Sequence, residues 1–253
     1  LMTKIHAEPV LITYDSITNC INKNDISNQN KLYDFTDKDG IKHEVWQMTQ
    51  KDKINAIIKN FASLPYLYIA DGHHRMASSL RCVKAERCLA YIIPKKEHNT
   101  YPFHRVLSTN KSIKKILKDM QDLFNIKEIN APHRQQNNIQ VYMRGKWYEI
   151  VFQKQDNKNI LDDLLVSKLL NKILEPIFNI KDERTNKNIR FISGNKSIKD
   201  IEKSINNNEI LFFMNTIQID TIIQIANNNK TTPPKSTFIL PKIPSGLIMM
   251  ELK

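Results

Sequence analysis

One stretch decides the fold: Leu-Tyr-Ile-Ala-Asp-Gly-His-His-Arg-Met-Ala-Ser-Ser-Leu, at residues 67–80. Its apolar beginning predicts a short buried strand over Tyr66–Ala70, because a brief apolar run that ends at turn residues is typical of a strand. Asp71-Gly72 predicts a turn, and the apolar residues from Met76 onward fall at helical spacing. The polar residues between these elements therefore lie where a strand ends and a helix begins.

The polar cluster Asp71-Gly72-His73-His74-Arg75 has the composition of a phosphate cradle. A helix start has unpaired N–H groups and the positive end of the helix dipole, the arginine suits phosphate, and the glycine permits close approach. Two other interpretations stay open. The aspartate can be a simple N-cap beside exposed histidines and a surface arginine. A metal site is the other, although neither Cys82 nor Cys88 forms a recognisable ligand pair with the histidines.

Composition indicates a globular protein without a membrane segment. The chain has 253 residues, 41% of them hydrophobic, and no uninterrupted apolar segment of membrane-spanning length. It carries three cysteines, an odd number at uninformative spacing, and no signal sequence, so we expect a cytoplasmic protein without a disulfide framework. The net charge of +12 comes from lysines scattered among many asparagines and isoleucines, as an A+T-rich genome would impose. Nucleic-acid binding is not predicted, because no basic stripe with interleaved aromatic residues is present.

The first portion of the chain, residues 1–110, is predicted to be a compact α+β domain. Val10–Tyr14 predicts a strand, and Asp39-Gly40 between two strand-like runs predicts a hairpin. Lys51–Phe61 predicts an amphipathic helix, and Leu89–Ile93 predicts another buried strand that follows the helix after the polar cluster.

The second portion, residues 111–253, is also predicted to be α+β, with a boundary near Ser108–Ser112 and no flexible linker. Its expected elements are a helix from Ser112 to Leu123, a hairpin turning at Arg144-Gly145, a helix over Leu161–Ile177 that Pro176 helps to end, strands at Arg190–Ser193 and Ile210–Met214 separated by a helix, and a helix over Ile219–Ala226.

Two further segments are candidates for ligand contact. His104-Arg105 is either a pair of loop residues or part of a site. The segment Pro233–Ile248 holds four prolines, which reduce the entropy lost when it becomes ordered. Within it Lys235, Ser236 and Thr237 would together suit an anion, whereas the other interpretation is a docked tail that covers a sheet edge.

These residues resemble the prokaryotic "domain of unknown function 1015" family, whose members look like free-serine kinases. The motifs that carry the resemblance are His6-x-Glu8-Pro9-Val10, Asp39-Gly40-Ile41-x-His43-x-x-Trp46, Tyr68 to Arg75, His104-Arg105, Gly145-x-Trp147-Tyr148, and Pro234-Lys235-Ser236-Thr237…Pro241-Lys242…Ser245-Gly246-Leu247. The resemblance implies a ParB/sulfiredoxin-like fold for the first portion. The family has a longer N-terminal region, so we expect the chain to be a fragment that lacks part of it.

The resemblance also implies roles for the polar cluster. Asp71 would lie near the transferred phosphoryl group or its Mg²⁺, and the four residues that follow it would bind the phosphates of ATP or ADP. Glu8 would be the general base, with Glu44 the second candidate. The hydroxyl acceptor would be a free amino acid such as L-serine. Further contacts to substrate or phosphate would come from His104, Arg105, Lys235, Ser236 and Thr237.

An alternative function is a non-catalytic nucleotide-binding regulatory or DNA-associated module of the ParB type, which would keep His74 and Arg75 without needing Glu8. Sulfiredoxin-type reduction is excluded, because it needs a cysteine where position 73 is histidine. The expected partners are a nucleotide and a small hydroxyl amino acid, without nucleic acid or membrane, and a homodimer is left open.

Overall fold

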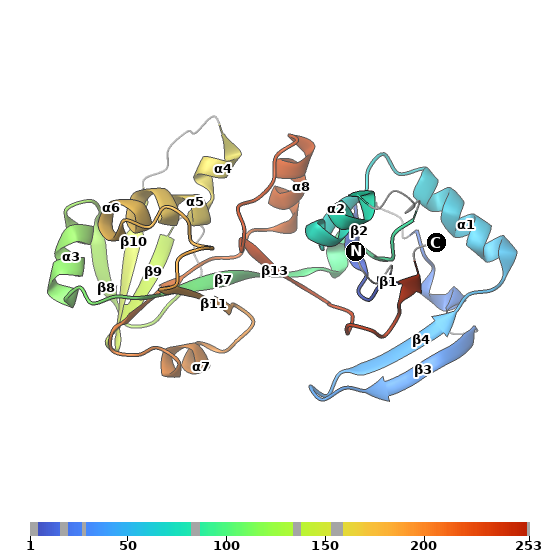
Figure 1. Ribbon diagram of the computed structural model, residues 1–253, viewed down its shortest axis with the longest axis horizontal. Coiled ribbons are helices and arrows are strands. Elements are labelled where there is room, and N and C mark those ends of the chain that lie inside the picture. Colours follow the sequence, from blue (N-terminus) through green and yellow to red (C-terminus); the bar gives the residue numbers. More distant parts are fainter. Residues whose placement is uncertain are drawn as a thin grey trace. The chain divides into compact units, whose positions relative to one another are not determined.

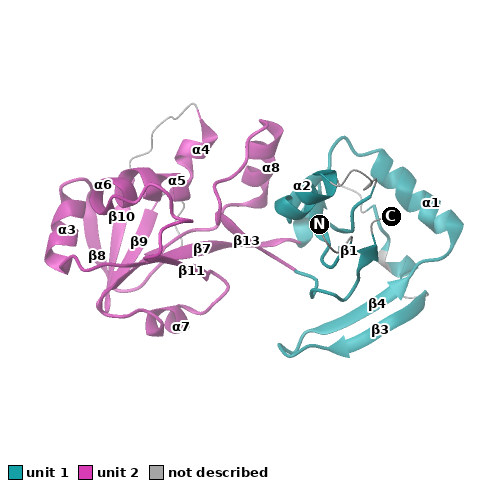
Figure 2. Ribbon diagram, in the orientation of Figure 1, with its two compact units in different colours: residues 1–97, 242–253 teal, residues 98–241 magenta. Residues whose placement is uncertain are grey.

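The computed structural model describes residues 5–15, 20–26, 29–81, 87–133, 138–152 and 159–251. These residues form a mixed α+β protein (Figure 1). The chain divides into two compact units, unit 1 with Leu1–Glu97 and Lys242–Lys253, and unit 2 with His98–Pro241 (Figure 2). Cys82 lies outside the described residues, and so does the end of the helix that the sequence predicts to continue from Met76 to about Lys84. Within the described ranges, no helix combines the length and apolar character needed to cross a membrane.

The boundary between the units falls earlier than the predicted division into 1–110 and 111–253. Strand β7 (Asn99–Ser108) pairs with β11 (Ile189–Ser193) and β12 (Glu209–Phe213), both from the second portion. This long strand therefore belongs to unit 2. Its partners lie about a hundred residues further along the chain, which explains why no local boundary signal marks it.

The end of the described chain returns to unit 1, which also differs from the predicted division. Strand β14 (Met250–Glu251) pairs antiparallel with β1 (Ile5–His6). The N–H of Gly246 donates to the carbonyl of Ala7 at 2.9 Å. We call the segment from Lys242 to β14 the return segment. These contacts hold it beside β1 and Ala7, which precede β2.

Unit 1 has a three-stranded sheet with β2 (Val10–Tyr14) in the centre. Strand β5 (Tyr68–Asp71) pairs with it antiparallel and β6 (Ala90–Pro94) pairs parallel. All five residues of β2 are buried, as expected for an apolar strand between two neighbours. Strand β5 begins two residues later than predicted, and Tyr66 and Leu67 are 66% and 45% exposed ahead of it.

Helix α2 (His73–Arg81) follows β5 directly and begins earlier than predicted. The N–H of Met76 donates to the carbonyl of Gly72 at 3.0 Å, so the first helical turn already includes the histidines and the arginine of the cluster. The predicted order of strand, turn and helix is confirmed, with the turn reduced to the single residue Gly72 between the two elements.

The predicted hairpin and the predicted amphipathic helix of unit 1 are confirmed. Strands β3 (Asn30–Thr36) and β4 (Lys42–Gln47) form the predicted hairpin, in which Gly40 has a φ of +79°. Asp37 holds the turn, because its carboxylate accepts the N–H groups of Asp39 and Ile41 at 2.9 Å each. Its other oxygen lies 2.8 Å from Nε2 of His43; that contact and the two N–H groups lower the pKa of the Asp37 carboxyl. The helical elements are α1 (Lys51–Ala62) and the 3₁₀ turns η1 (Lys23–Asp25) and η2 (Lys95–Glu97).

Unit 2 is built on one antiparallel sheet. Its strands lie in the order β11, β7, β12, β9 (Asn138–Met143), β10 (Lys146–Val151) and β8 (Ile126–Ile129), with β13 (Thr237–Leu240) paired to the first residues of β7. The predicted hairpin at Arg144-Gly145 and both predicted strands near residues 190 and 210 are confirmed.

The two faces of this sheet carry separate apolar cores. Leu107, Val141 and Phe212 point to the larger core, where Ile116 and Leu169 of the covering helices join them. Residues one position away in the same strands, such as Val106 and Leu211, point to the smaller core. Five helices of unit 2 are α3 (Ile113–Gln121), α4 (Ile160–Asp163), α5 (Leu165–Leu169), α6 (Glu175–Phe178) and α8 (Ile219–Asn227). A further helix, α7 (Ile198–Lys203), contributes to the smaller core.

The predicted single helix over Leu161–Ile177 is wrong. Leu164 has an extended backbone with ψ of 134° and separates α4 from α5. A π-helical turn, η3 (Leu170–Leu174), then leads into α6, which contains Pro176 and is followed by its C-cap residue Asn179 with φ of 56°. Proline has no N–H for an α-helical bond, so a wider turn ahead of it accommodates the ring.

Acid is expected to destabilise unit 2 partly through Glu209. Arg190 donates to both of its oxygens at 3.0 Å, and this interaction lowers the pKa of the Glu209 carboxyl against the opposing effect of burial. A depressed carboxyl pKa contributes stability that is complete above the unfolded pKa and is lost as pH falls through the folded pKa. The free energy of unfolding, measured by urea denaturation, should therefore fall less between neutral and acid pH in Glu209→Gln than in the parent protein.

Glu128→Gln is the matched control, because Glu128 pairs with Lys146 at the surface and its side chain is 57% exposed. It should retain the acid sensitivity of the parent protein. An unchanged acid profile in Glu209→Gln would contradict the assignment.

Candidate functional site

Three charged side chains meet where β5 ends, α2 begins and the chain enters β2. Arg75 Nη1 donates to Glu8 Oε2 at 2.7 Å, and Arg75 Nη2 lies 3.8 Å from Asp71 Oδ2. The pairing of Leu11 with Asp71 explains this meeting, because it sets the entrance of β2 beside the end of β5. The structure thus brings Glu8 and Asp71 together on one guanidinium, although 67 residues separate Glu8 from Arg75.

Gly72 is required by both backbone and space. Its φ is +91°, a backbone angle that residues other than glycine rarely adopt. A Cβ at this position would lie 2.8 Å from Nη2 and 3.0 Å from Nε of Arg75. The Arg75 Nε atom is buried and makes no hydrogen bond with another described residue. The glycine therefore lets the guanidinium fold against the backbone and face both carboxylates.

The return segment adds two polar contacts that sequence reasoning did not assign to the site. Lys242 Nζ donates to Asp71 Oδ2 at 3.1 Å. The hydroxyl of Ser245 donates to Glu8 Oε1. We call Glu8, Asp71, Arg75, Lys242 and Ser245 the carboxylate cluster. The sequence indicates a role for Lys242 and Ser245 only in that both belong to the motif Pro234-Lys235-Ser236-Thr237…Pro241-Lys242…Ser245-Gly246-Leu247.

The two histidines of the sequence motif behave differently from the arginine. His73 and His74 are exposed in the first turn of α2, a helix of nine residues. The side chain of Arg75 is half-buried and points into the carboxylate cluster. The histidines are thus available to solvent at a helix start, as the phosphate cradle requires, while the arginine is held by carboxylates.

A buried histidine and serine fix the elements beneath the cluster. His6 is 8% exposed, and its Nδ1 accepts the N–H of Leu89 at 3.3 Å. The proton must then lie on Nε2, which donates to Ser79 Oγ at 2.8 Å, and Ser79 in turn donates to the carbonyl of Arg75 at 2.9 Å. Because its proton is used in this bond, Ser79 connects β1 to α2 and is not arranged as a nucleophile.

Two carboxylates alone do not complete a magnesium site, so the carboxylate cluster would hold that ion only together with phosphate and water oxygens. The described residues contain no group of three or more histidine, cysteine or acidic side chains placed to hold a metal. Magnesium is commonly held by one or two carboxylates together with phosphates and water, so a cage made only of protein is not needed. Glu8 and Asp71 have side chains that are each 41% exposed and suit this arrangement.

His104 and Arg105 lie in the core of unit 2. His104 is 0% exposed, stacks on Phe213 with 4.2 Å between ring centroids, and accepts the N–H of Met214 on Nδ1 at 3.0 Å. Arg105 is 1% exposed and its Nε donates to Glu183 at 2.8 Å. Burial lowers the pKa of the Arg105 guanidinium, and Glu183 opposes this. The resemblance implies that both residues contact substrate or phosphate. In the structure their side chains instead contact groups within unit 2 and have almost no accessible surface.

The Lys235-Ser236-Thr237 segment also belongs to unit 2. Lys235 Nζ lies 5.0 Å from the ring centroid of Phe103, and the hydroxyl of Ser236 donates to the carbonyl of Pro233 at 2.5 Å. Thr237 begins β13, which pairs with β7. The structure thus agrees with the interpretation of a tail docked on a sheet edge.

Glu44, the second candidate for the base, belongs to the exposed hairpin of unit 1. Its Oε1 accepts from Lys31 at 2.8 Å and lies 3.1 Å from Lys42 Nζ. These two lysines lower the pKa of the Glu44 carboxyl, with Lys31 the larger cause. Glu44 is therefore occupied on the hairpin, and Glu8 is the carboxylate that lies in the cluster.

If the protein is the phosphotransferase that the resemblance implies, Gly72→Ala should displace Arg75 from the carboxylates and lower kcat/KM about 100-fold, the order expected for a displacement near 1 Å. Gly40→Ala is a matched control, because Gly40 has a similar φ of +79° but no atom within 4 Å of an added Cβ. Both variants should share the backbone strain, visible as a small fall in thermal stability. Equal activities of the two variants would contradict the role given to the close contact.

Comparison with known proteins gives distant structural likenesses. A conserved hypothetical protein from Pyrococcus furiosus is 14% identical, with a TM-score of 0.49 over 100% of this chain and 83% of that chain. SbnI with a C-terminal truncation, from Staphylococcus aureus, is 7% identical, with a TM-score of 0.49 over 94% of this chain and 70% of that chain. A mutant free serine kinase in complex with ADP is 16% identical, with a TM-score of 0.44 over 74% and 72%. No curated protein matches.

A sequence family gives a firmer result. The family described as "Protein of unknown function (DUF1015)" matches residues 1–170, which include Glu8, the polar cluster at residues 71–75 and the whole sheet of β2, β5 and β6. The match spans 170 of 253 residues and confirms the resemblance found in the motifs. The chain therefore belongs to the DUF1015 family.

Proposed function

We propose that the protein is a small-molecule kinase, which transfers a phosphoryl group from ATP or ADP to the hydroxyl of a free amino acid, L-serine. The observation that carries the proposal is the pair of carboxylates, Glu8 and Asp71, that share the guanidinium of Arg75 at the start of a helix. A base, an anion-binding helix start and a carboxylate suited to Mg²⁺ are the parts that this reaction needs. We assign unit 1 to the ParB/sulfiredoxin-like fold on the same motifs.

In the proposed reaction Glu8 accepts the proton of the acceptor hydroxyl. The hydroxyl oxygen forms a bond to phosphorus while the bond from phosphorus to the bridging oxygen of the nucleotide breaks, and the departing nucleotide keeps the electron pair. Arg75 and Lys242 supply positive charge for the phosphates, and Asp71 would hold Mg²⁺. When bound, that ion offsets phosphate charge. Positioning and charge stabilisation of this kind account for most catalysis of phosphoryl transfer.

The contacts within the carboxylate cluster do not prevent a nucleotide from binding. Arg75 is 36% exposed at its side chain, and the side chains of Glu8 and Asp71 are 41% exposed. Ion pairs with this access to water are screened and contribute little to stability. Exchange of a carboxylate for a phosphate on Arg75 or on Lys242 therefore costs little, and the two cations are already directed at the site.

The direct test is to incubate the protein with Mg²⁺, L-serine and either ATP or ADP, and to detect O-phosphoserine by mass spectrometry. We expect phosphoserine with one of the two donors and none without nucleotide. Nucleotide binding without phosphorylation of serine or another hydroxyl amino acid would refute the kinase proposal and favour the non-catalytic module. A steep dependence of DNA affinity on salt would identify the DNA-associated form of that module.

A further inference from the structure

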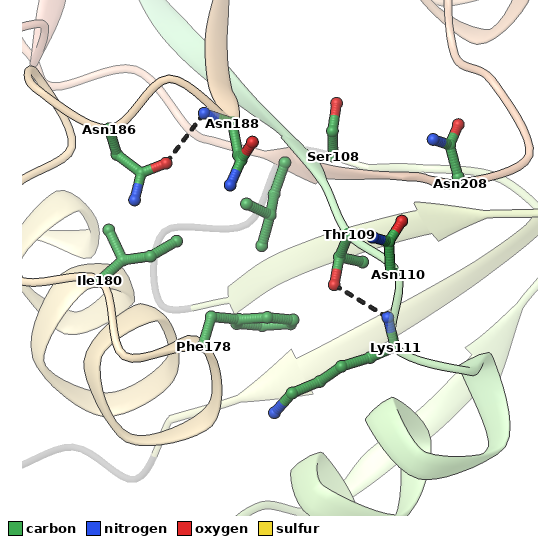
Figure 3. A pocket seen from close by; sticks show the side chains of 10 residues that line it. Ser108, Thr109, Asn110, Lys111, Phe178, Ile180, Asn186, Asn188 and Asn208 are labelled. Atoms are coloured by element: carbon green, nitrogen blue, oxygen red, sulfur yellow. Dashed lines mark hydrogen bonds between the residues drawn. The ribbon is translucent and has the colours of Figure 1, made fainter.

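Unit 2 contains a pocket of about 240 Å³ that is separate from the carboxylate cluster (Figure 3). The pocket lies where β7 ends at Ser108 and where β11 and β12 begin, directly after Asn188 and Asn208. Ser108 N donates to Asn188 O at 2.8 Å, and Thr109 N donates to Asn208 O at 2.9 Å. Since a water molecule occupies about 30 Å³ in the liquid, the space is large enough for a small organic ligand. These two hydrogen bonds join the backbone segments that line the pocket.

The walls of this pocket differ in chemistry. Leu107, Ile180 and the half-buried ring of Phe178 form an apolar side. In Figure 3 the asparagines and Thr109 lie on the other side of the space from Phe178. The polar side chains that line the pocket include Asn110, Asn186, Asn188 and Asn208.

Two of these carboxamides are available to a ligand. The side chains of Asn110 and Asn208 are exposed and make no hydrogen bond with another residue of the described ranges. Asn186 differs, because its oxygen already accepts the N–H of Asn188 at 2.9 Å. A carboxamide both donates and accepts, so the free ones suit a ligand edge that carries a donor beside an acceptor.

The charge of the pocket is small. Among the residues that the structure describes, no acidic side chain lines it, and Lys111 is the one charged residue that does. The ammonium group of Lys111 donates to the carbonyl of Ile177, lies 3.8 Å from Asp119 and is 5.4 Å from the ring centroid of Phe178. Its charge is therefore directed at partners inside unit 2. A pocket of this kind disfavours cations and gives no strong attraction to a phosphate, and it suits an uncharged ligand.

We propose that this pocket binds a nucleobase or a nucleoside, with the flat face of the base on Phe178 and its donor and acceptor edges on Asn110 and Asn208. Aromatic stacking combined with carboxamide hydrogen bonds is a common way for proteins to hold bases. The proposal does not depend on the kinase assignment, because it uses residues of unit 2 only and a ligand that has no phosphate.

The test is a titration of the ¹⁵N-labelled full chain with adenosine, guanosine, cytidine and uridine, followed by amide chemical shifts. We expect saturable shifts at Ser108, Thr109 and Lys111 with at least one nucleoside. Asn110→Ala and Asn208→Ala should each weaken binding about 3- to 10-fold, the range of one neutral hydrogen bond. Asn207→Ala is the matched control, since Asn207 is exposed beside Asn208 but does not line the pocket.

Several outcomes would overturn the proposal. These are no saturable shifts in unit 2 with any nucleoside, equal weakening by Asn207→Ala, and tighter binding of a monosaccharide such as glucose than of any nucleoside. Phe178→Leu adds an independent test, because it keeps an apolar side chain and removes the flat ring. It should weaken nucleoside binding and leave monosaccharide binding unchanged. Circular dichroism checks that each variant is folded. Shifts confined to unit 1 would report the nucleotide site and would also count against the pocket.

Discussion

Glu8→Gln is expected to lower kcat for phosphoryl transfer by about 10²- to 10⁴-fold, the range typical for loss of a general base. The amide has nearly the same shape, its one oxygen can accept from Arg75 and its NH2 group can donate to the Ser245 hydroxyl, but it cannot accept the proton of the acceptor hydroxyl. Nucleotide affinity should change little. The measurements are O-phosphoserine formation under saturating substrates and, separately, nucleotide binding by calorimetry.

Glu44→Gln is the control for this variant. Glu44 is paired with Lys31 and Lys42 on the hairpin, so its replacement should leave the rate unchanged. The reverse result, a slow Glu44→Gln and an active Glu8→Gln, would reassign the base to the hairpin. Loss of nucleotide binding together with activity in Glu8→Gln would instead indicate that Glu8 mainly orients Arg75.

Glu183→Ala is expected to lower the free energy of unfolding by about 3–5 kcal/mol, because it leaves a buried guanidinium without its carboxylate. The side chains of Arg105 and Glu183 are 1% and 10% exposed, and their ion pair spans 2.8 Å. Arg105 also donates to the carbonyl of Phe103 at 2.7 Å, which does not replace the lost charge. Urea denaturation followed by circular dichroism measures the change.

The neighbouring surface pair supplies the control. Asp182 pairs with Arg184 at 3.2 Å, with side chains 39% and 63% exposed, so Asp182→Asn should leave the free energy of unfolding nearly unchanged. If Glu183→Ala were as stable as Asp182→Asn, Arg105 would have to find another partner or reach solvent. That result would restore Arg105 as a candidate for substrate contact.

The local elements of unit 1 could be predicted because their signals are local. The apolar run of β2, the Asp39-Gly40 turn and the polar residues between β5 and α2 are each encoded in a few consecutive residues. The position of the polar cluster followed from the same rule, since a strand that ends at glycine and continues as a helix leaves its N–H groups exposed. These predictions required no knowledge of which strands pair.

Other features depended on contacts between distant segments and could not be read locally. Lys242 and Asp71 are 171 residues apart, and no spacing rule connects them. His104-Arg105 looked like a site motif because two polar residues are adjacent, yet in a strand adjacent residues point to opposite faces and here both faces of β7 are buried. The continuous apolar pattern over Leu161–Ile177 concealed a break at Leu164, because an extended leucine buries as well as a helical one.

The return segment has a consequence for synthesis of the protein. Glu8 and its partner Ser245 are 237 residues apart, so at about 5–20 residues per second the ribosome makes Ser245 roughly 10–50 s after Glu8. Unit 2 is continuous in sequence at His98–Pro241 and is complete before the return segment leaves the ribosome. The nascent chain can therefore finish its later unit first, which reverses the usual order for multidomain proteins. Until translation passes Ser245, the chain holds the carboxylates Glu8 and Asp71 without Lys242 and Ser245.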